Sequence, residues 1–381
     1  MRYDVAVIGL GGMGSAILAQ CAARGGSVIG VEQYRALHAL GSSHGKSRMI
    51  RKAYFEEPAY VPLLRRASEL WRELEHATRM EILRTTGVLT VGEPSSEIIT
   101  GTQRAAAEHG LPLESLSRAQ VRMRHPSLLM RPEEVAVFES DAGVLDPERA
   151  IAAHLEIARA HGAEMRFETA MKSWQAASSG FEISLANGQT VAARILVLAL
   201  GPWFKETLET LGVPIRVQRN VQAWFAPATA GYNAPGFPAF LLARRDLPAP
   251  LYGFPDFGQG LKVAFHGGGV LTDTEHIDRE VDAARDLDPL VRAMEKWMPG
   301  ATATFRDAAA CMYTLTPDEH FVIDRHPAHP NLILCGGFSG HGFKFAPVIG
   351  EIAADLALDG GTRHHIDFLS LRRFRRSTPD D

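Results

Sequence analysis

A glycine cluster close to the N-terminus constrains the fold more than any other feature of this sequence. The run Gly9–Gly14 follows an apolar stretch, Val5–Ile8, and opens an alanine-rich stretch over residues 15–24. A second apolar run, Ser27–Val31, comes next. This order predicts a strand, a helix and a second strand. Such a β-α-β unit implies a parallel sheet with helices packed on its faces.

The spacing of the glycines is typical of a dinucleotide-binding turn. Gly9 permits the tight turn, Gly11 lets the backbone approach a pyrophosphate, and Gly14 lets helix and strand pack closely. Glu32 ends the second strand, where an acid accepts hydrogen bonds from a ribose hydroxyl. The pattern fits NAD and FAD equally well. It predicts cofactor contacts at Gly9, Gly11, Gly12, Met13, Gly14, Glu32 and Gln33.

Further parallel-type elements recur in the middle of the chain and near its end. The apolar runs Arg194–Leu200 and Leu332–Cys335 predict buried strands, and Asp146-Pro147 predicts the first turn of a helix over Glu148–His161. The region 218–306 is richer in aromatics, prolines and alternating patterns, which favours an antiparallel sheet. The order of elements within 81–132 stays open.

These patterns predict an α/β protein in which a Rossmann-like nucleotide-binding domain carries an inserted α+β substrate domain on a largely antiparallel sheet. We expect the first domain to comprise residues 1–85, 143–217 and 308–381, and the second to comprise 86–142 and 218–307.

Charge and cysteine content narrow the setting of the protein. The formal net charge of -4 gives no electrostatic case for nucleic acid or an anionic membrane as the main partner. The one basic run, Arg372, Arg373, Arg375 and Arg376, suggests a solvated tail. Three cysteines are too few for a secreted disulfide framework, and no apolar run is long enough to span a bilayer. We therefore expect a cytoplasmic protein without a membrane segment.

Two polar, glycine-flanked loops carry the remaining candidate chemistry. In residues 41–51, small hydroxyl side chains and exposed N–H groups suit a diphosphate, and the guanidinium groups of Arg48 and Arg51 could clamp a carboxylate. In residues 336–345, a helix N-terminus and Lys344 would set positive charge against an anionic centre such as the edge of a reduced flavin. Taken singly, an arginine pair is more often on the surface, and His341 more often structural.

The stretch Ala309–Phe321 distinguishes NAD from FAD and a functional from a structural role of the two loops. Its sequence Cys311-Met-Tyr-Thr-Leu-Thr-Pro-Asp-Glu-His-Phe, together with the two loops, resembles the monomeric sarcosine oxidase and N-methyltryptophan oxidase family. The resemblance runs from Tyr3 to about Phe368. It implies a glutathione-reductase-type FAD domain, a substrate domain, and FAD bonded covalently through its 8α-methyl group to Cys311.

The same resemblance assigns roles to individual residues. It implies that Arg51 and Lys344 hold a substrate carboxylate, that Arg48 lies close to the flavin, and that Lys262 promotes reaction with O2. Further cavity residues would be Leu241, Tyr252, His266, Tyr313 and His341. The remaining cofactor contacts are expected at Ser42, Ser43, His44, Ser47, Gly201, Trp203, Met312, Phe338, Gly340, Gly342 and Phe343. Cys21 and Cys335 are expected to be packing residues.

We therefore predict a monomeric FAD-dependent oxidase of a secondary amino acid, sarcosine or another N-methyl amino acid. Hydride equivalents would pass to flavin N5, O2 would become H2O2, and the imine would hydrolyse in water. No catalytic metal is expected, because the histidines lack ligand spacing. The basic stretch Ala239–Asp246 leaves substrate choice open. Alternatives are N-methyltryptophan, pipecolate or fructosyl amino acids as substrates, an NAD-dependent dehydrogenase, and a non-catalytic flavin-binding protein.

Overall fold

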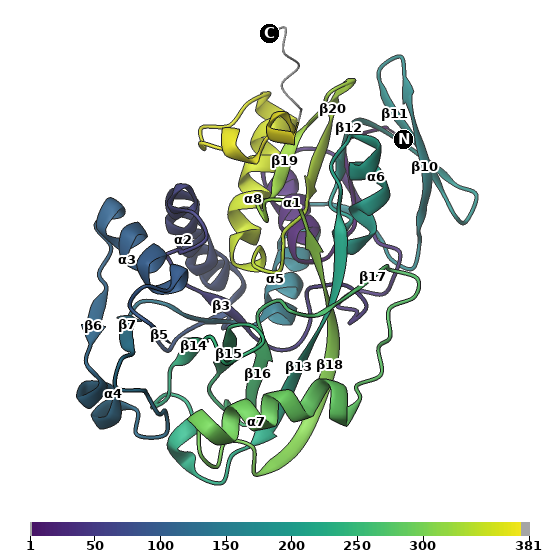
Figure 1. Cartoon of the computed structure of the whole chain (residues 1–381). Helices are drawn as coiled ribbons and strands as arrows, with labels where there is room; N and C mark the ends of the chain where they lie inside the picture. The colour runs from purple at the N-terminus through teal and green to yellow at the C-terminus, as the bar shows by residue number, and fades with distance from the viewer. Residues whose placement is uncertain (1, 375–381) are drawn as a thin grey trace, which may run out of the picture.

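Two large β-sheets organise the chain in the computed structural model, which describes residues 2–374 (Figure 1). The first sheet has eight strands and the second has nine, and a small sheet has three. The α-helices of these residues are α1 (Gly12–Ala23), α2 (Val61–Thr78), α3 (Glu97–His109), α4 (Arg118–Arg124), α5 (Pro147–Ala160), α6 (Lys205–Thr210), α7 (Asp288–Trp297) and α8 (Ala346–Ala354).

The first sheet is parallel at its centre and confirms the expected β-α-β unit. Its strands are β1 (Arg2–Ile8), β2 (Val28–Val31), β9 (Glu164–Arg166), β10 (Met171–Ala177), β11 (Gly180–Leu185), β12 (Thr190–Leu198), β19 (Val322–His326) and β20 (His329–Gly336). Strand β1 pairs in parallel with β2 and β12, and β12 pairs in parallel with β20. Helix α1 connects β1 to β2, so the glycine turn lies at the carboxyl end of β1.

Both faces of this sheet are covered, as a parallel sheet requires. Val5 and Val7 of β1 face a core that includes residues of α1, α5 and α8. Ala6 and Ile8 face the opposite core, which includes β11 and the beginning of α6. Figure 1 shows α1, α5 and α8 grouped on one side and the β10–β11 hairpin projecting from the other. The alternation explains why β1 is apolar along most of its length.

The second sheet is antiparallel apart from one pair, as expected from the alternating patterns. Its strands are β5 (Val88–Gly92), β6 (Glu114–Leu116), β7 (Val135–Glu139), β13 (Arg216–Ala226), β14 (Ala239–Ala243), β15 (Leu251–Phe254), β16 (Leu261–Phe265), β17 (Val270–Thr272) and β18 (Thr304–Leu315). The parallel pair is β5 with β14. Helix α7 covers one face, where Met294 and Trp297 share a core with Leu261 and Val263.

A small antiparallel sheet connects the segments between the larger sheets. It consists of β3 (Arg48–Ile50), β4 (Leu83–Thr85) and β8 (Gly143–Leu145), in the order β3-β8-β4. Helix α5 follows β8, and the Asp146 side chain accepts a hydrogen bond from Arg149 N at 2.9 Å, which confirms the expected N-cap. The structure also supplies the order left open in 81–132, which is β4, β5, α3, β6 and α4.

Strand β18 pairs with β13 from Thr304 to Leu315, so the second sheet continues through residues 307 and 308. Cys311 therefore lies on the antiparallel sheet, because the long β13–β18 pairing continues through it. Arg373 is no solvated tail residue, since its guanidinium lies 2.7 Å from Asp318. Arg375 and Arg376 lie outside the described residues.

Candidate active site

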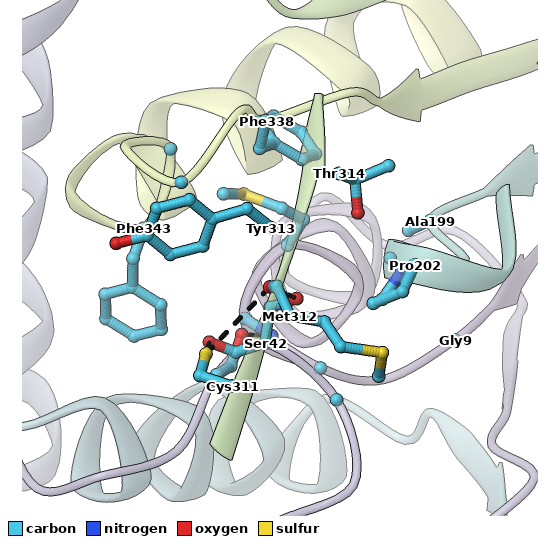
Figure 2. Close-up of a pocket in the computed structure, with 18 of the residues that line it drawn as sticks. Gly9, Ser42, Ala199, Pro202, Cys311, Met312, Tyr313, Thr314, Phe338 and Phe343 are labelled. Atoms are coloured by element: carbon cyan, nitrogen blue, oxygen red, sulfur yellow. Dashed lines mark hydrogen bonds between the residues drawn. The ribbon is translucent and has the colours of Figure 1, made fainter. Parts of the chain in front are cut away.

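A cavity of about 440 Å³ is lined by residues of both large sheets and of the loops between them. Figure 2 shows part of it, with β18 crossing in front of helix α1 and Cys311, Met312 and Tyr313 following one another along the strand. The lining begins at Glu32, beside the glycine turn, and extends to Lys344 and Leu241. One cavity thus joins the candidate cofactor residues to the candidate substrate residues.

The glycine turn has the geometry that its sequence predicts. Gly9 has a φ of +87°, a left-handed conformation that favours glycine. A Cβ on Gly14 would lie 1.6 Å from the Gly9 carbonyl oxygen, so only glycine permits this helix-strand contact. A Cβ on Gly11 would meet only Ser43 Oγ, at 4.0 Å, which leaves room for a ligand to approach the backbone. No side chain caps helix α1 at Gly11.

Glu32 lies at the ribose position of such a turn and is already partly bonded. Its carboxylate accepts hydrogen bonds from Leu10 N at 2.8 Å and Tyr34 N at 3.0 Å, and His38 Nε2 lies 3.5 Å away. Burial acts to raise the pKa of Glu32, but these hydrogen bonds, the one from His38 first, hold it below its usual range. Glu32 is therefore an anion. His38 also lines the cavity, which the sequence did not indicate.

The first polar loop is tied to β18 beside Cys311. Ser42 Oγ donates to Met312 O at 2.7 Å, and Cys311 Sγ lies 3.6 Å from Ser42 O (Figure 2). Arg48 donates to Ser42 O at 2.7 Å and to Ser47 O at 2.8 Å. These bonds fix the loop against the strand and turn the Cys311 thiol toward it.

The antiparallel register gathers the cavity side chains of the second sheet. Directly opposite residues on neighbouring strands share a face. Asn220 is opposite Cys311 in the β13–β18 pair. The next row across the sheet runs Leu241, Tyr252, Ala264, Gln222 and Ala309, from β14 to β18. This row brings together residues that are far apart in the sequence. Asn220 and Gln222 line the cavity and were not expected there.

The two cations expected to hold a carboxylate both line the cavity, and one is already paired. Arg51 Nη2 lies 2.8 Å and 2.7 Å from the two carboxylate oxygens of Glu56. The guanidinium also lies over the rings of Tyr54 and Phe55, at 4.7 Å and 4.4 Å from their centroids. Glu56 lines the cavity, and sequence reasoning missed it because an acid five residues after Arg51 on an irregular loop has no periodic signal.

Burial and ion pairing determine the charge states of Glu56 and Lys344. Burial raises and Arg51 lowers the pKa of Glu56, which settles at about 2, so Glu56 is an anion. Burial lowers the pKa of Lys344 to about 7 against the opposing effect of Glu56. Lys344 Nζ donates to His341 O at 2.6 Å, and Trp71 Nε1 donates to Lys344 O at 2.9 Å.

His266, His341 and Tyr313 of the cavity are uncharged. Burial lowers the pKa of His341 to about 3 and that of His266 to about 4, and it raises the pKa of Tyr313. His341 Nε2 donates to Glu319 O at 3.0 Å, so its Nδ1 must accept from the hydroxyl of Tyr54. The ring is held as one neutral tautomer.

Four of the expected site residues do not line the cavity: Gly14, His44, Ser47 and Lys262. Gly14 acts through the close packing described above. Lys262 lies behind the first polar loop and is 1% exposed. Its Nζ donates to Gly45 O at 2.7 Å and to Ser47 O at 3.0 Å. The other expected residues, Gly201, Trp203 and Phe338 among them, line the cavity.

These residues fit a flavin dinucleotide. The open approach to Gly11 at the N-terminus of α1 suits a diphosphate, and Glu32 is an anion at the ribose position. Gln222 Nε2 is buried and has no hydrogen-bond partner among the described residues, which leaves it free to donate to a polar ring edge. Within residues 2–374, no cluster of His, Cys, Asp or Glu could hold a metal ion.

Comparison with known proteins identifies the family. The profile of the family described as FAD dependent oxidoreductase matches residues 4–356. The chain belongs to this family. It is therefore a flavoenzyme. The glycine turn fits NAD and FAD equally well, and the family identifies the cofactor as FAD. The NAD-dependent dehydrogenase and the non-catalytic binding protein are set aside.

Individual relatives match over nearly the full length. The chain is 44% identical to a monomeric sarcosine oxidase of Streptomyces avermitilis, over 97% of each protein. It is 33% identical to an N-methyl-L-tryptophan oxidase of Yersinia pestis, over 98% of this chain and 100% of that protein. Among solved structures, NikD, an amino acid oxidase of nikkomycin biosynthesis, superimposes with a TM-score of 0.85, at 24% identity and 97% coverage of both chains. The fold is thus that of flavin-dependent amine oxidases. No helix among the described residues is long and apolar enough to cross a membrane.

Proposed function

We propose that this flavoenzyme oxidises a secondary amino acid, sarcosine or another N-methyl amino acid, and passes the electrons to O2. One observation carries the proposal: Arg51 and Lys344 line the same cavity as Cys311 and the glycine turn. Two cations beside a flavin site suit a substrate that presents a carboxylate near a C–N bond. The names of the sarcosine and N-methyltryptophan oxidases among the relatives agree with this substrate class.

The substrate carboxylate would compete with Glu56 for Arg51. Both oxygens of Glu56 accept from the single Nη2 of Arg51, and a bound carboxylate could take over these contacts. Lys344 would supply the second contact in its protonated form. The positive charges of both residues would also lower the pKa of a nearby substrate amine and favour its uncharged, oxidisable form.

Bound FAD would accept hydride equivalents from the substrate and deliver two electrons to O2. The protein side chains supply position and polarity. Tyr252, Tyr313, His266 and His341 are neutral groups that can fix the substrate without trapping it as an ion pair. Arg48, held to the loop carbonyls, and Lys262, buried behind them, would stabilise negative charge that develops near the flavin.

Covalent attachment of the flavin through Cys311 is part of the proposal. Support comes from the thiol's position on the cavity-facing side of β18, next to the loop at Ser42. Acid precipitation of the purified protein should leave the yellow colour in the pellet. Cys311→Ala should release the colour to the supernatant, and Cys335→Ala, which removes another buried thiol, should not. Release from the unaltered protein would contradict the link.

A peroxide screen tests the function itself. The purified protein is given sarcosine, other N-methyl amino acids, N-methyltryptophan, pipecolate, proline and fructosyl amino acids in aerated buffer. We expect H2O2 from sarcosine or another N-methyl amino acid at the highest kcat/KM. If pipecolate or a fructosyl amino acid gives the highest value, the assignment to N-methyl amino acids is wrong. If none gives peroxide, the oxidase proposal fails.

We also propose a monomer in the cytoplasm. The monomeric sarcosine oxidase among the relatives supports the first part. The three cysteines are free thiols, which agrees with a reducing compartment. Light scattering of the purified protein measures the mass, for which 41.6 kDa is the expected value.

A further inference from the structure

The ammonium group of Lys262 is buried among backbone carbonyls and aromatic rings. Its two acceptors, Gly45 O and Ser47 O, belong to the first polar loop. The rings of Trp224 and Phe254 each lie 5.3 Å from Nζ. A buried cation with such neighbours needs a counter-charge to stay protonated.

The carboxylate of Glu148 lies on the other side of the same loop. Glu148 Oε1 accepts from Gly45 N at 2.7 Å, and Oε2 accepts from Lys46 N at 3.1 Å. Lys46 has a φ of +66°, which is unfavourable for a residue with a side chain, so the turn needs external contacts to hold this backbone conformation. Glu148 is half-buried in the first turn of α5, which fixes its backbone.

One peptide group connects the acid to the ammonium. The peptide between Gly45 and Lys46 donates its N–H to Glu148 and accepts from Lys262 at its C=O. In a trans peptide these two groups point in opposite directions, so the anion and the cation lie at the two ends of one peptide dipole. Hydrogen bonds in such a chain polarise and strengthen each other.

Several other charged groups lie around Lys262, and most of them disfavour its protonated form. Arg48 of β3 and Lys46 of the loop repel the ammonium, and His44 lies near enough to interact with it. Glu148 of α5 acts in the opposite direction, and a Cys311 bonded to the flavin carries no charge. Lys46 itself lies 4.0 Å from Asp307. Burial is the largest influence and holds the pKa of Lys262 well below its usual range.

We propose that Glu148 is a positioning residue for Lys262, which it holds and keeps protonated through the Gly45–Lys46 peptide. The inference rests on the proposed role of Lys262 in O2 reduction. In that reaction O2 takes up two electrons, supplied by the reduced cofactor, and two protons to become H2O2. The first electron makes superoxide, and an ammonium stabilises its charge whereas a neutral amine does not.

Reoxidation of the holoenzyme by O2 tests the inference without a substrate. The flavin is reduced photochemically without oxygen, mixed with O2 in a stopped-flow instrument, and followed by absorbance from pH 6 to 10, a range chosen to bracket the titration. The variants are Glu148→Gln, Glu148→Asp and Lys262→Met. Glu156→Gln is the matched control, because Glu156 is exposed on the same helix. Glutamine can keep one hydrogen bond to the loop but lacks the charge.

We expect Lys262→Met to slow reoxidation about 100-fold at the low end of the pH range, where the parent ammonium is protonated, and by less as the pH rises. Glu148→Gln should slow it about tenfold at neutral pH, and the fall of the rate with rising pH should move to lower pH, because the counter-charge is gone. Glu148→Asp should recover part of the rate, and Glu156→Gln should match the parent. If Glu148→Gln does not fold, the pH profile of Glu148→Asp decides, with an unshifted profile counting against the proposal.

Two outcomes separate the possible failures. If Lys262→Met reoxidises as fast as the parent, the proposed role of Lys262 is wrong and the inference falls with it. If Lys262→Met is slow while Glu148→Gln keeps the parent rate and pH profile, only the assignment of Glu148 is wrong.

Discussion

The glycine turn at the cofactor end of the cavity is one short stretch of chain, whereas the charged side chains at the substrate end come from segments far apart in sequence. The glycine turn works through backbone conformation, with Gly9 at positive φ and Gly14 in contact with the Gly9 carbonyl. The substrate end works through charged side chains, and Arg51 and Lys344 come from opposite ends of the chain. A backbone site tolerates few substitutions, while a side-chain site can be tuned residue by residue.

The largest expected effect is at the backbone end. Gly14→Val sets a side chain where a Cβ already lies 1.6 Å from the Gly9 carbonyl, so α1 must move away from β1. We expect loss of most bound flavin and at least about 3 kcal/mol of folding free energy. Flavin absorbance per protein and denaturant unfolding measure both. Gly361→Ala is the control, because a Cβ there has no neighbour within 4 Å. Full flavin content in Gly14→Val would show that the cofactor end does not depend on the backbone conformation of the glycine turn.

Arg51→Ala should give the next largest effect and should leave the flavin in place. Loss of a buried guanidinium that contacts the substrate carboxylate costs about 3 kcal/mol, or roughly 100-fold in kcat/KM. Steady-state peroxide kinetics with the best substrate of the screen measure it. The double variant Arg51→Ala/Glu56→Gln shows how much of the loss is repulsion by the unpaired Glu56. Arg104→Ala, at a side chain 56% exposed, should have no effect.

Glu56→Gln should act in the opposite direction on ligand binding. Because the Glu56 carboxylate pairs with Arg51, its neutralisation leaves the guanidinium free for an incoming carboxylate. We expect acetate to bind about tenfold more tightly, as judged by titration of the flavin absorbance. Glu57→Gln, which changes the neighbouring acid, should leave the affinity unchanged. Weaker binding in Glu56→Gln would mean that Glu56 assists the ligand instead of competing with it.

The smallest expected effect is a pH dependence at the substrate end. Burial lowers the pKa of Lys344 to about 7, so the free protein loses this cation as the pH rises through that value. Acetate should therefore bind about fivefold more weakly at about pH 9 than at about pH 6. His266 and His341, with pKa values of about 4 and about 3, are neutral throughout this range. Lys344→Met should abolish the dependence, and an unchanged pH profile in that variant would assign the titration elsewhere.

Much of the architecture could be predicted because it is encoded locally. The strand Val5–Ile8, the glycine turn and the helix cap at Asp146 each depend on a few adjacent residues with strong conformational preferences. The β13–β18 pairing could not be predicted, because the two strands lie some ninety residues apart and no local signal marks where the pairing stops. Arg373 was misjudged for the same reason, since its partner Asp318 is distant in sequence.

The sequence by itself determined that this protein has a dinucleotide turn, and its resemblance to known oxidases indicated FAD and the set of cations. Only the tertiary structure decided how those cations are compensated. Glu56 pairs with Arg51, and Glu148 reaches Lys262 through the loop that carries Gly45. Backbone conformation is set by neighbours along the chain, whereas the charge state of a buried side chain depends on burial and on charges brought near it by folding.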